Sequence, residues 1–194
     1  MREIYPEGTM IVRASQVQSP ARSIWFLTLQ NLNTIAQRIR EGEKVEPITR
    51  VGNQLISPIT GRTLARALDQ IIKKMHEEDN FRGVIHVSST NAYSSADTCR
   101  MLAEALGLKG DFVEKMIVDT TLEKVAEDAK VRRKLDIVPT RPKNSILDVN
   151  RFIQEFGDGF LHPVEEEILR FLAQYRYLIE EKYPDLMQFI REQN

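Results

Sequence analysis

Two groups of polar side chains in this chain have the chemistry needed to hold a negatively charged ligand. Each follows a short apolar run, the first over residues 10–14 and the second over residues 83–87. An arginine guanidinium makes bidentate contacts to phosphate or carboxylate oxygens, and hydroxyl and amide groups donate to the same atoms. The alternative for the arginine is an ordinary surface or ion-paired role. The residues predicted to contact an anion are Arg13, Ser15, Gln16, Ser88 and Ser89.

Hydrophobic periodicity indicates the elements that position these residues. The predicted strands are residues 10–14, 54–56, 84–87, 112–118 and 135–138. The predicted helices are residues 20–42 behind an N-cap at Ser19, then 61–75, 96–107, 121–134, 146–156 and 163–181, with Pro184 ending the last one.

The alternation of strands and helices predicts an α/β fold with a mainly parallel sheet and helices on both faces, a three-layer αβα arrangement. Ligands of such sheets lie beyond the carboxyl ends of the strands, which is where Arg13 and Ser88 fall. We expect a single domain over residues 1–194, with a helical C-terminal extension from about residue 145.

The order of four segments resembles the histidine phosphatase superfamily, the phosphoglycerate mutase-like proteins. These segments are residues 10–16, 56–66, 83–90 and 94–108. The first strand of that superfamily ends in Arg-His-Gly and a later strand ends in Ser-Ser. The resemblance implies that Arg13 is the first phosphate-binding arginine and that Ala14 occupies the position of the nucleophilic histidine.

The same resemblance implies a general acid shortly after the third strand, where Asp119 stands and Glu123 is a weaker candidate. A carboxyl group can act as an acid only if burial or neighbouring charge raises its pKa. The competing interpretation of Asp119 is a solvated residue at a helix start. The closing strand of the superfamily, with its Val-Ser-His-Gly motif, is not found, because the chain ends in a helical pattern.

Three functions follow as expectations. The leading one is a catalytically impaired or inactive histidine phosphatase-like protein with a residual anion-binding cleft or an interaction role. The second is an active phosphatase or mutase on small phosphate monoesters that uses a relocated nucleophile, His86 or His162. The third is a structural or regulatory α/β protein that forms homo-oligomers through its C-terminal helices. The apolar face there consists of Leu169, Leu172, Tyr175, Leu178 and Ile179, which core packing explains equally well.

The charge and cysteine content of the chain limit the binding partners and the cellular compartment that we expect for it. The 194 residues include 27 basic and 28 acidic ones, so overall charge favours neither nucleic acid nor an anionic membrane. The single cysteine, Cys99, allows no internal disulfide, so we expect a cytoplasmic protein. We predict no metal and no cofactor, since the histidine spacing fits no zinc motif and the sequence contains no Gly-x-Gly-x-x-Gly or phosphate-binding loop.

Overall fold

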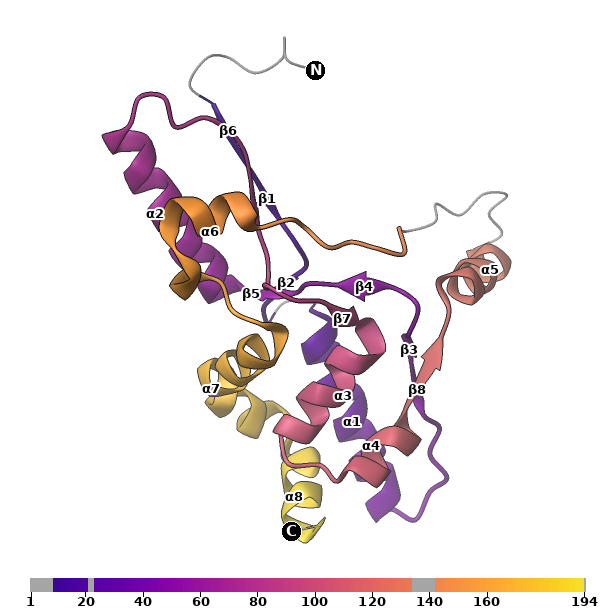
Figure 1. Ribbon diagram of the computed structural model, residues 1–194. Coiled ribbons are helices and arrows are strands. Elements are labelled where there is room, and N and C mark those ends of the chain that lie inside the picture. Colours follow the sequence, from indigo (N-terminus) through magenta and orange to yellow (C-terminus); the bar gives the residue numbers. More distant parts are fainter. Residues whose placement is uncertain (1–8, 21–22, 134–141, 194) are drawn as a thin grey trace.

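The computed structural model describes residues 9–20, 23–133 and 142–193, and within them helices surround four separate pairs of strands (Figure 1). Three of these pairs are parallel and one is antiparallel. The α/β class expected from the sequence is therefore confirmed. Every helix within these ranges is too short or too polar to traverse a bilayer.

The upper part of the molecule in Figure 1 is built on the parallel pair β1 (Met10–Ala14) and β6 (Gly83–Val87). Helix α2 (Gly61–Glu77), helix α6 (Asn150–Phe156) and the 3-10 turn Asp158–Phe160 accompany it. Buried side chains from these elements form what we call the upper cluster. Its members are Ile59, Ala67, Ile71, Phe81, Ile85, Val87, Val149, Phe152 and Leu161.

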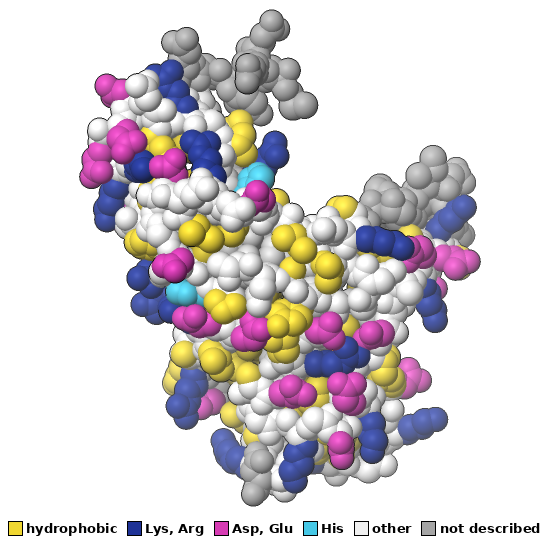
Figure 2. Space-filling view, in the orientation of Figure 1, with side chains coloured by type: hydrophobic (Ala, Val, Ile, Leu, Met, Phe, Trp, Pro, Cys, Tyr) yellow, Lys and Arg dark blue, Asp and Glu magenta, His cyan; other side chains and the backbone are white. Residues whose placement is uncertain are grey.

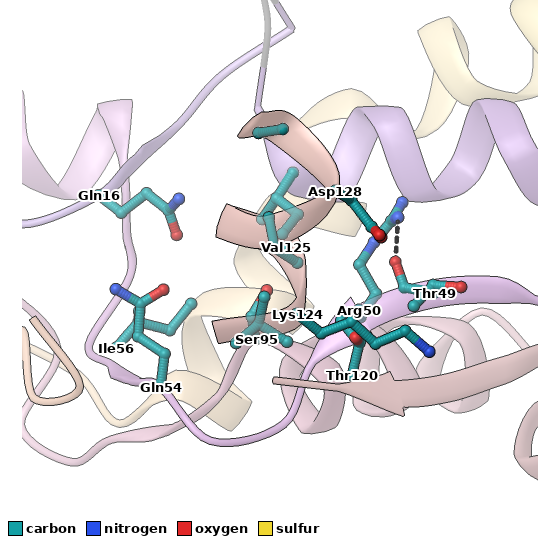
Figure 3. Close-up of a pocket in the computed structure, with 13 residues that line it drawn as sticks. Gln16, Thr49, Arg50, Gln54, Ile56, Ser95, Thr120, Lys124, Val125 and Asp128 are labelled. Carbon is teal, nitrogen blue, oxygen red and sulfur yellow. Dashed lines mark hydrogen bonds between the residues drawn. The ribbon is translucent and has the colours of Figure 1, made fainter. Parts of the chain in front are cut away.

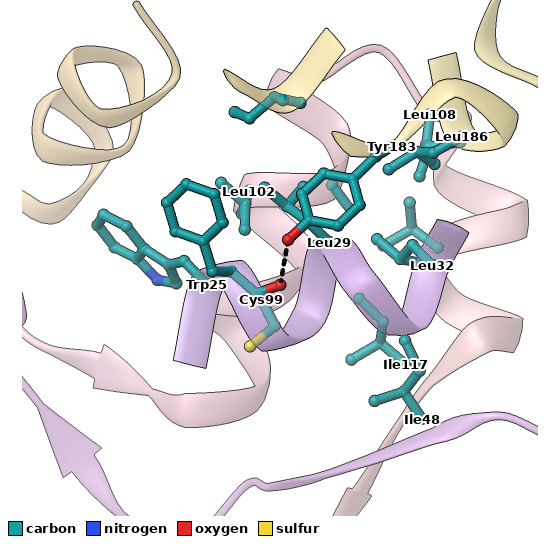
Figure 4. Packing of buried hydrophobic residues seen from close by; sticks show 14 of the residues in the cluster. Trp25, Leu29, Leu32, Ile48, Cys99, Leu102, Leu108, Ile117, Tyr183 and Leu186 are labelled. Carbon is teal, nitrogen blue, oxygen red and sulfur yellow. Dashed lines mark hydrogen bonds between the residues drawn. The ribbon is translucent and has the colours of Figure 1, made fainter. Parts of the chain in front are cut away.

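The lower part holds five helices: α1 (Ile24–Arg40), α3 (Ser95–Ala105), α4 (Gly110–Met116), α7 (Val164–Lys182) and α8 (Pro184–Gln193). They pack with the parallel pair β3 (Ile48–Val51) and β8 (Ile117–Thr120) around a larger core, the lower cluster. Figure 4 shows its centre, with Leu29 and Leu102 between Trp25 on one side and Leu186 of α8 on the other. Cys99 is buried there as well.

Two short strand pairs join these parts. β2 (Val17–Gln18) runs parallel to β5 (Ile59–Thr60), and β4 (Leu55–Ile56) runs antiparallel to β7 (Tyr93–Ser94). Helix α5 (Leu122–Arg133) follows β8 and projects to the right in Figure 1. None of residues 122–131 is buried, so α5 is attached to the rest by its polar contacts.

Several predicted elements match the structure closely. The strand over residues 10–14 is confirmed residue for residue, and the strands and helices at 84–87, 61–75 and 121–134 differ only at their ends. The first helix, however, begins at Ile24, because the N-cap is Ser23 and not Ser19. The Ser23 hydroxyl accepts a hydrogen bond from the Phe26 amide at 3.2 Å.

Other predictions were wrong. The expected strand at 112–118 is mostly helix α4, because Phe112, Val113 and Met116 recur at helical spacing and Val113 is buried against the lower cluster. Residues 43–60 contain three strands instead of one. Helix α6 begins at Asn150, four residues later than expected from position 146. The predicted strand at 135–138 lies outside the described residues.

Candidate functional site

A mixed polar and apolar hollow lies where the two parts of the molecule meet α5 (Figure 3). It encloses about 630 Å³, within the range typical of small-molecule sites. Strands β3 and β8, helices α1, α3 and α5, and the segment around β4 all contribute to its wall. Its polar lining consists of Gln16, Thr49, Arg50, Gln54, Ser95, Thr120 and Lys124, together with one carboxylate, Asp128. We call it the central cavity.

Arg50 is the best fixed cation of the central cavity. Its Nη1 donates to the Thr49 carbonyl oxygen at 3.0 Å, and its Nη2 and Nε donate to Thr28 Oγ1 at 3.1 and 3.3 Å. Thr28 is buried and its Oγ1 lies 3.2 Å from Cys99 Sγ. The lower cluster thus holds the guanidinium in place, and these bonds leave part of its donor set for a ligand.

The α5 wall of the cavity is fastened by a small polar network at the start of that helix. The Asn53 side chain donates to Glu123 Oε2 at 2.8 Å and accepts from the Leu122 amide at 2.8 Å. Lys143 Nζ lies 2.8 Å from Glu123 Oε1. The hydrogen bond from Lys143, then those from the Glu123 amide and Asn53, lower the pKa of Glu123 to about 2. The network fixes the turn from which Lys124 and Val125 reach the cavity.

Asp119 does not face this cavity as a free acid. Its carboxylate forms an ion pair with Arg100 Nη2, which also donates to the Ile117 carbonyl at 3.0 Å, while Arg100 Nη1 lies 2.9 Å from Asp97 Oδ1. A Cβ on Gly52 would lie only 2.5 Å from Asp119 Oδ2, so glycine is required for this close approach. The structure therefore gives Asp119 a bracing contact between β8, α3 and the turn after β3.

The five predicted anion contacts lie in different surroundings. The ends of β1 and β6 are neighbours, as expected, and the Ser15 amide donates to the Val87 carbonyl at 3.1 Å. Ser88 and Ser89 are buried, and their hydroxyls donate to the carbonyls of Ser89 and Pro58. The Ser15 hydroxyl donates to the Ser57 carbonyl.

Arg13 and Ala14 are exposed at the end of β1, and neither lines the central cavity. Of the five predicted contacts, Gln16 alone borders it. Among the histidines, His86 Nδ1 lies 3.0 Å from the Asp148 carbonyl oxygen, and His162 is buried with its Nδ1 3.4 Å from Glu166.

The sequence interpretation missed Arg50 and Lys124. Arg50 lies outside every predicted strand and helix, and Lys124 lies on the predicted helix 121–134, for which no site residue other than Glu123 was expected. Strand alternation could not have revealed Arg50, because residues two apart share a face of a strand and Arg50 therefore lies on the same face as the buried Ile48.

Comparison with known proteins gives the family. A family model described as the RmlD substrate binding domain matches residues 7–177. A dTDP-4-dehydrorhamnose reductase from Bacillus anthracis, solved in complex with NADP, superposes with a TM-score of 0.61 at 19% identity over 85% of this chain and 48% of that one. An orthologous reductase from Clostridium acetobutylicum gives 0.59 at 14% identity over 86% and 49%.

A third reductase, from Yersinia enterocolitica, gives a TM-score of 0.56 at 18% identity over 86% of this chain and 49% of that one. At such identities the likeness shows a shared fold. This chain spans about half the length of these solved structures.

The residues that the structure describes do not fit a dinucleotide such as NADP. A dinucleotide-binding turn needs glycines between a strand and a helix so that the backbone can approach the pyrophosphate. Here β1 leads through Ser15 and Gln16 into β2, and β6 leads into Ser88 and Ser89, without such a glycine. Within these ranges there is also no group of three or more histidine, cysteine or acidic side chains that could hold a metal ion.

These findings correct the histidine phosphatase interpretation, together with the phosphatase and mutase functions derived from it. Arg13-Ala14-Ser15 is not a degenerate catalytic motif, and the family of the solved neighbours is one of reductases and epimerases. Only the α/β, three-layer class survives from the resemblance. Because the family model covers most of its length, the chain belongs to the RmlD substrate binding domain family.

Proposed function

We propose that this chain binds a sugar nucleotide in the central cavity and orients it for a reductase or epimerase of the RmlD type. The observation that carries the proposal is the cavity itself, in which a fixed guanidinium, amide and hydroxyl groups, and an apolar wall surround one space in a chain of this family. Similar solved structures are named as enzymes of dTDP-sugars, and one is a complex with UDP-glucuronic acid and NAD.

The three kinds of lining match the three parts of such a ligand. Arg50 and Lys124 supply positive charge for a diphosphate, since charge-assisted hydrogen bonds to phosphate are the strong ones. Gln16 and Thr120 can bond sugar hydroxyls. Ile24 and Val125, joined by Val51 and Ala129, offer apolar surface for a base.

The proposal assigns binding and orientation to these residues and no step of hydride transfer. The described residues offer no glycine-rich turn for a dinucleotide, and the chain spans about half of each reductase to which it is similar. In this proposal the groups that carry out hydride transfer lie outside the described residues.

Titration calorimetry with dTDP-glucose tests the proposal. We expect saturable binding that Arg50→Ala weakens about tenfold to a hundredfold, the effect of losing hydrogen bonds to a charged group. Arg176→Ala is the matched control, because Arg176 pairs with Glu180 on the exposed face of α7 and is remote from the cavity lining. Absence of saturable binding, or equal affinity in the Arg50 variant, would refute the proposal, provided that thermal melting shows a folded protein.

Location and assembly remain proposals as well. We propose a cytoplasmic location, which the single buried cysteine supports and cell fractionation tests. We propose self-association through the one residue of the predicted α7 face that is exposed, Leu169, since Tyr175 and Ile179 pack into or against the lower cluster. Size measurement in solution, with a Leu169→Glu variant, tests it.

A further inference from the structure

A second hollow, which shares no lining residue with the central cavity, lies where the first turns of α2 meet α7. It encloses about 290 Å³. Three of its six lining residues are arginines: Arg62 and Arg66 from α2 and Arg170 from α7. Figure 2 shows basic side chains at the left margin of the molecule, where Figure 1 places these two helices. We call this hollow the arginine groove.

The three guanidinium groups differ in how they are held. Arg62 and Arg66 are four residues apart on α2, so they lie on the same face of that helix. Both are exposed, and neither forms an ion pair within the described part of the chain. Arg170 is anchored by Glu166, whose Oε1 accepts from its Nη2 at 2.7 Å and from its Nε at 3.0 Å. One wall of the groove is therefore rigid, and the opposite wall carries two cations with free donors.

Among the described residues, Glu166 pairs with Arg170, and no carboxylate forms an ion pair with the other two arginines of the arginine groove. Glu167 lies beneath it, but this side chain is fully buried and its oxygens accept from the Thr60 amide and the Thr63 hydroxyl, both at 2.7 Å. The first turn of α2 contains no acidic residue, and the helix dipole adds partial positive charge at that end. Two unpaired cations therefore face a concave space in which the local field is positive.

We propose that the arginine groove is a second anion site, which binds the phosphate group of a small phosphorylated molecule. Planar guanidinium groups on two walls match the oxygens of a phosphate better than point charges would. The volume is at the lower end of the range for small-molecule sites, which suits a phosphate or diphosphate group.

The test adds pyrophosphate to the full chain at low salt. ¹H–¹⁵N spectra record the chemical-shift changes of the backbone amides of α2 and of α5, and the two sets are analysed separately. We expect saturable shifts over residues 61–66, and the double variant R62A/R66A should weaken that binding event about tenfold or more. A second variant, R62K/R66K, keeps the charge but loses the fork and should give an intermediate affinity. Arg176→Ala, which removes one positive charge from the same helix as Arg170, is the control and should bind as wild type.

The variants also separate this site from the central cavity. Arg50→Ala should abolish shifts near α5 and leave those of residues 61–66 unchanged, whatever the outcome with dTDP-glucose. The proposal is overturned if pyrophosphate gives no saturable shifts over residues 61–66, if R62A/R66A leaves them unchanged, or if Arg50→Ala removes them. Binding of anionic vesicles without binding of pyrophosphate would overturn it too. Because Arg62 and Arg66 are exposed, unchanged thermal melting should accompany the loss of binding.

Discussion

The lower and upper clusters differ in how completely they enclose their strands. In the lower cluster, α3 packs against β3 and β8 and α4 packs against β8, while α1, α7 and α8 complete a core that brings several aromatic rings into contact. In the upper cluster, β1 and β6 form a two-stranded sheet whose outer residues stay partly open, including the exposed Val84 and Arg13. Parallel strands are usually buried on both faces. The upper part thus has less apolar burial to stabilise it.

The central cavity depends mainly on the lower part. Ile24 comes from α1, Arg50 from β3, Ser95 from α3 and Thr120 from β8. A binding site is more precise when its side chains stand on well-packed elements, and Arg50 is bonded to the buried Thr28 of α1. We infer that loosening the upper cluster disturbs the cavity less than loosening the lower one.

The largest expected effect compares one buried phenylalanine from each cluster. Phe171 lies 5.0 Å from the ring of Trp25, 5.1 Å from that of Phe26 and 5.1 Å from that of Tyr175, whereas Phe152 has one ring neighbour, Phe156, at 4.7 Å. Phe171→Ala should lower the free energy of unfolding by about 5 kcal/mol and Phe152→Ala by about 3 kcal/mol. Urea denaturation measures both. An equal or larger loss in the Phe152 variant would contradict the comparison.

A loss of stability of intermediate size is expected for a substitution at Gly52, which lies at the edge of the lower part next to the central cavity. Gly52→Ala places a Cβ against Asp119, whose carboxylate is held by Arg100, so the variant should lose about 1–3 kcal/mol of stability. In an Asp119→Ala background the obstructing atoms are gone, and the same glycine change should be much milder. A double-mutant cycle by denaturation measures the coupling. Additive losses would show that Asp119 does not cause the strain.

The smallest effect concerns α5, which belongs to neither cluster. Because the pKa of Glu123 is lowered from 4.5 to about 2, its contacts stabilise the folded protein above pH 4.5. That contribution should fall as the pH drops from 4.5 to 2, and solvent exposure keeps it modest. NMR titration of the Glu123 carboxyl should show the low pKa, which Lys143→Ala raises and Lys143→Arg preserves. An unchanged pKa of Glu123 in the Lys143→Ala variant would show that Lys143 does not cause the lowered pKa.

The sequence predicted the elements whose signal is local. Residues 10–14 and 83–87 are short apolar runs, and α2 follows a clear helical period, so these were found. The strand β3 was missed because it is extended through its pairing with β8, which lies far away in the chain. A local sequence pattern does not reveal such a partner. The four residues of β3 also sit in a stretch of polar residues and glycine.

The candidate site was harder to predict for a related reason. A serine after a strand can turn its hydroxyl toward a ligand or toward a nearby carbonyl, and Ser88 and Ser89 do the latter. Which of the two occurs depends on the neighbouring strand. Gln16, two residues after the end of β1, was predicted from its place in the sequence and borders the central cavity, whereas the position of Arg50 depends on a distant partner, Thr28.

The buried thiol of Cys99 can serve as a chemical reporter of local opening of the lower cluster. Burial raises the pKa of this thiol, so a reactive thiolate scarcely forms while the larger core stays shut. Alkylation under native conditions must wait for that core to open, and a molecule with a single sulfhydryl reports one such event without interference from others. The rate of alkylation of Cys99, followed by mass spectrometry, therefore reports how often the lower cluster that supports Arg50 opens.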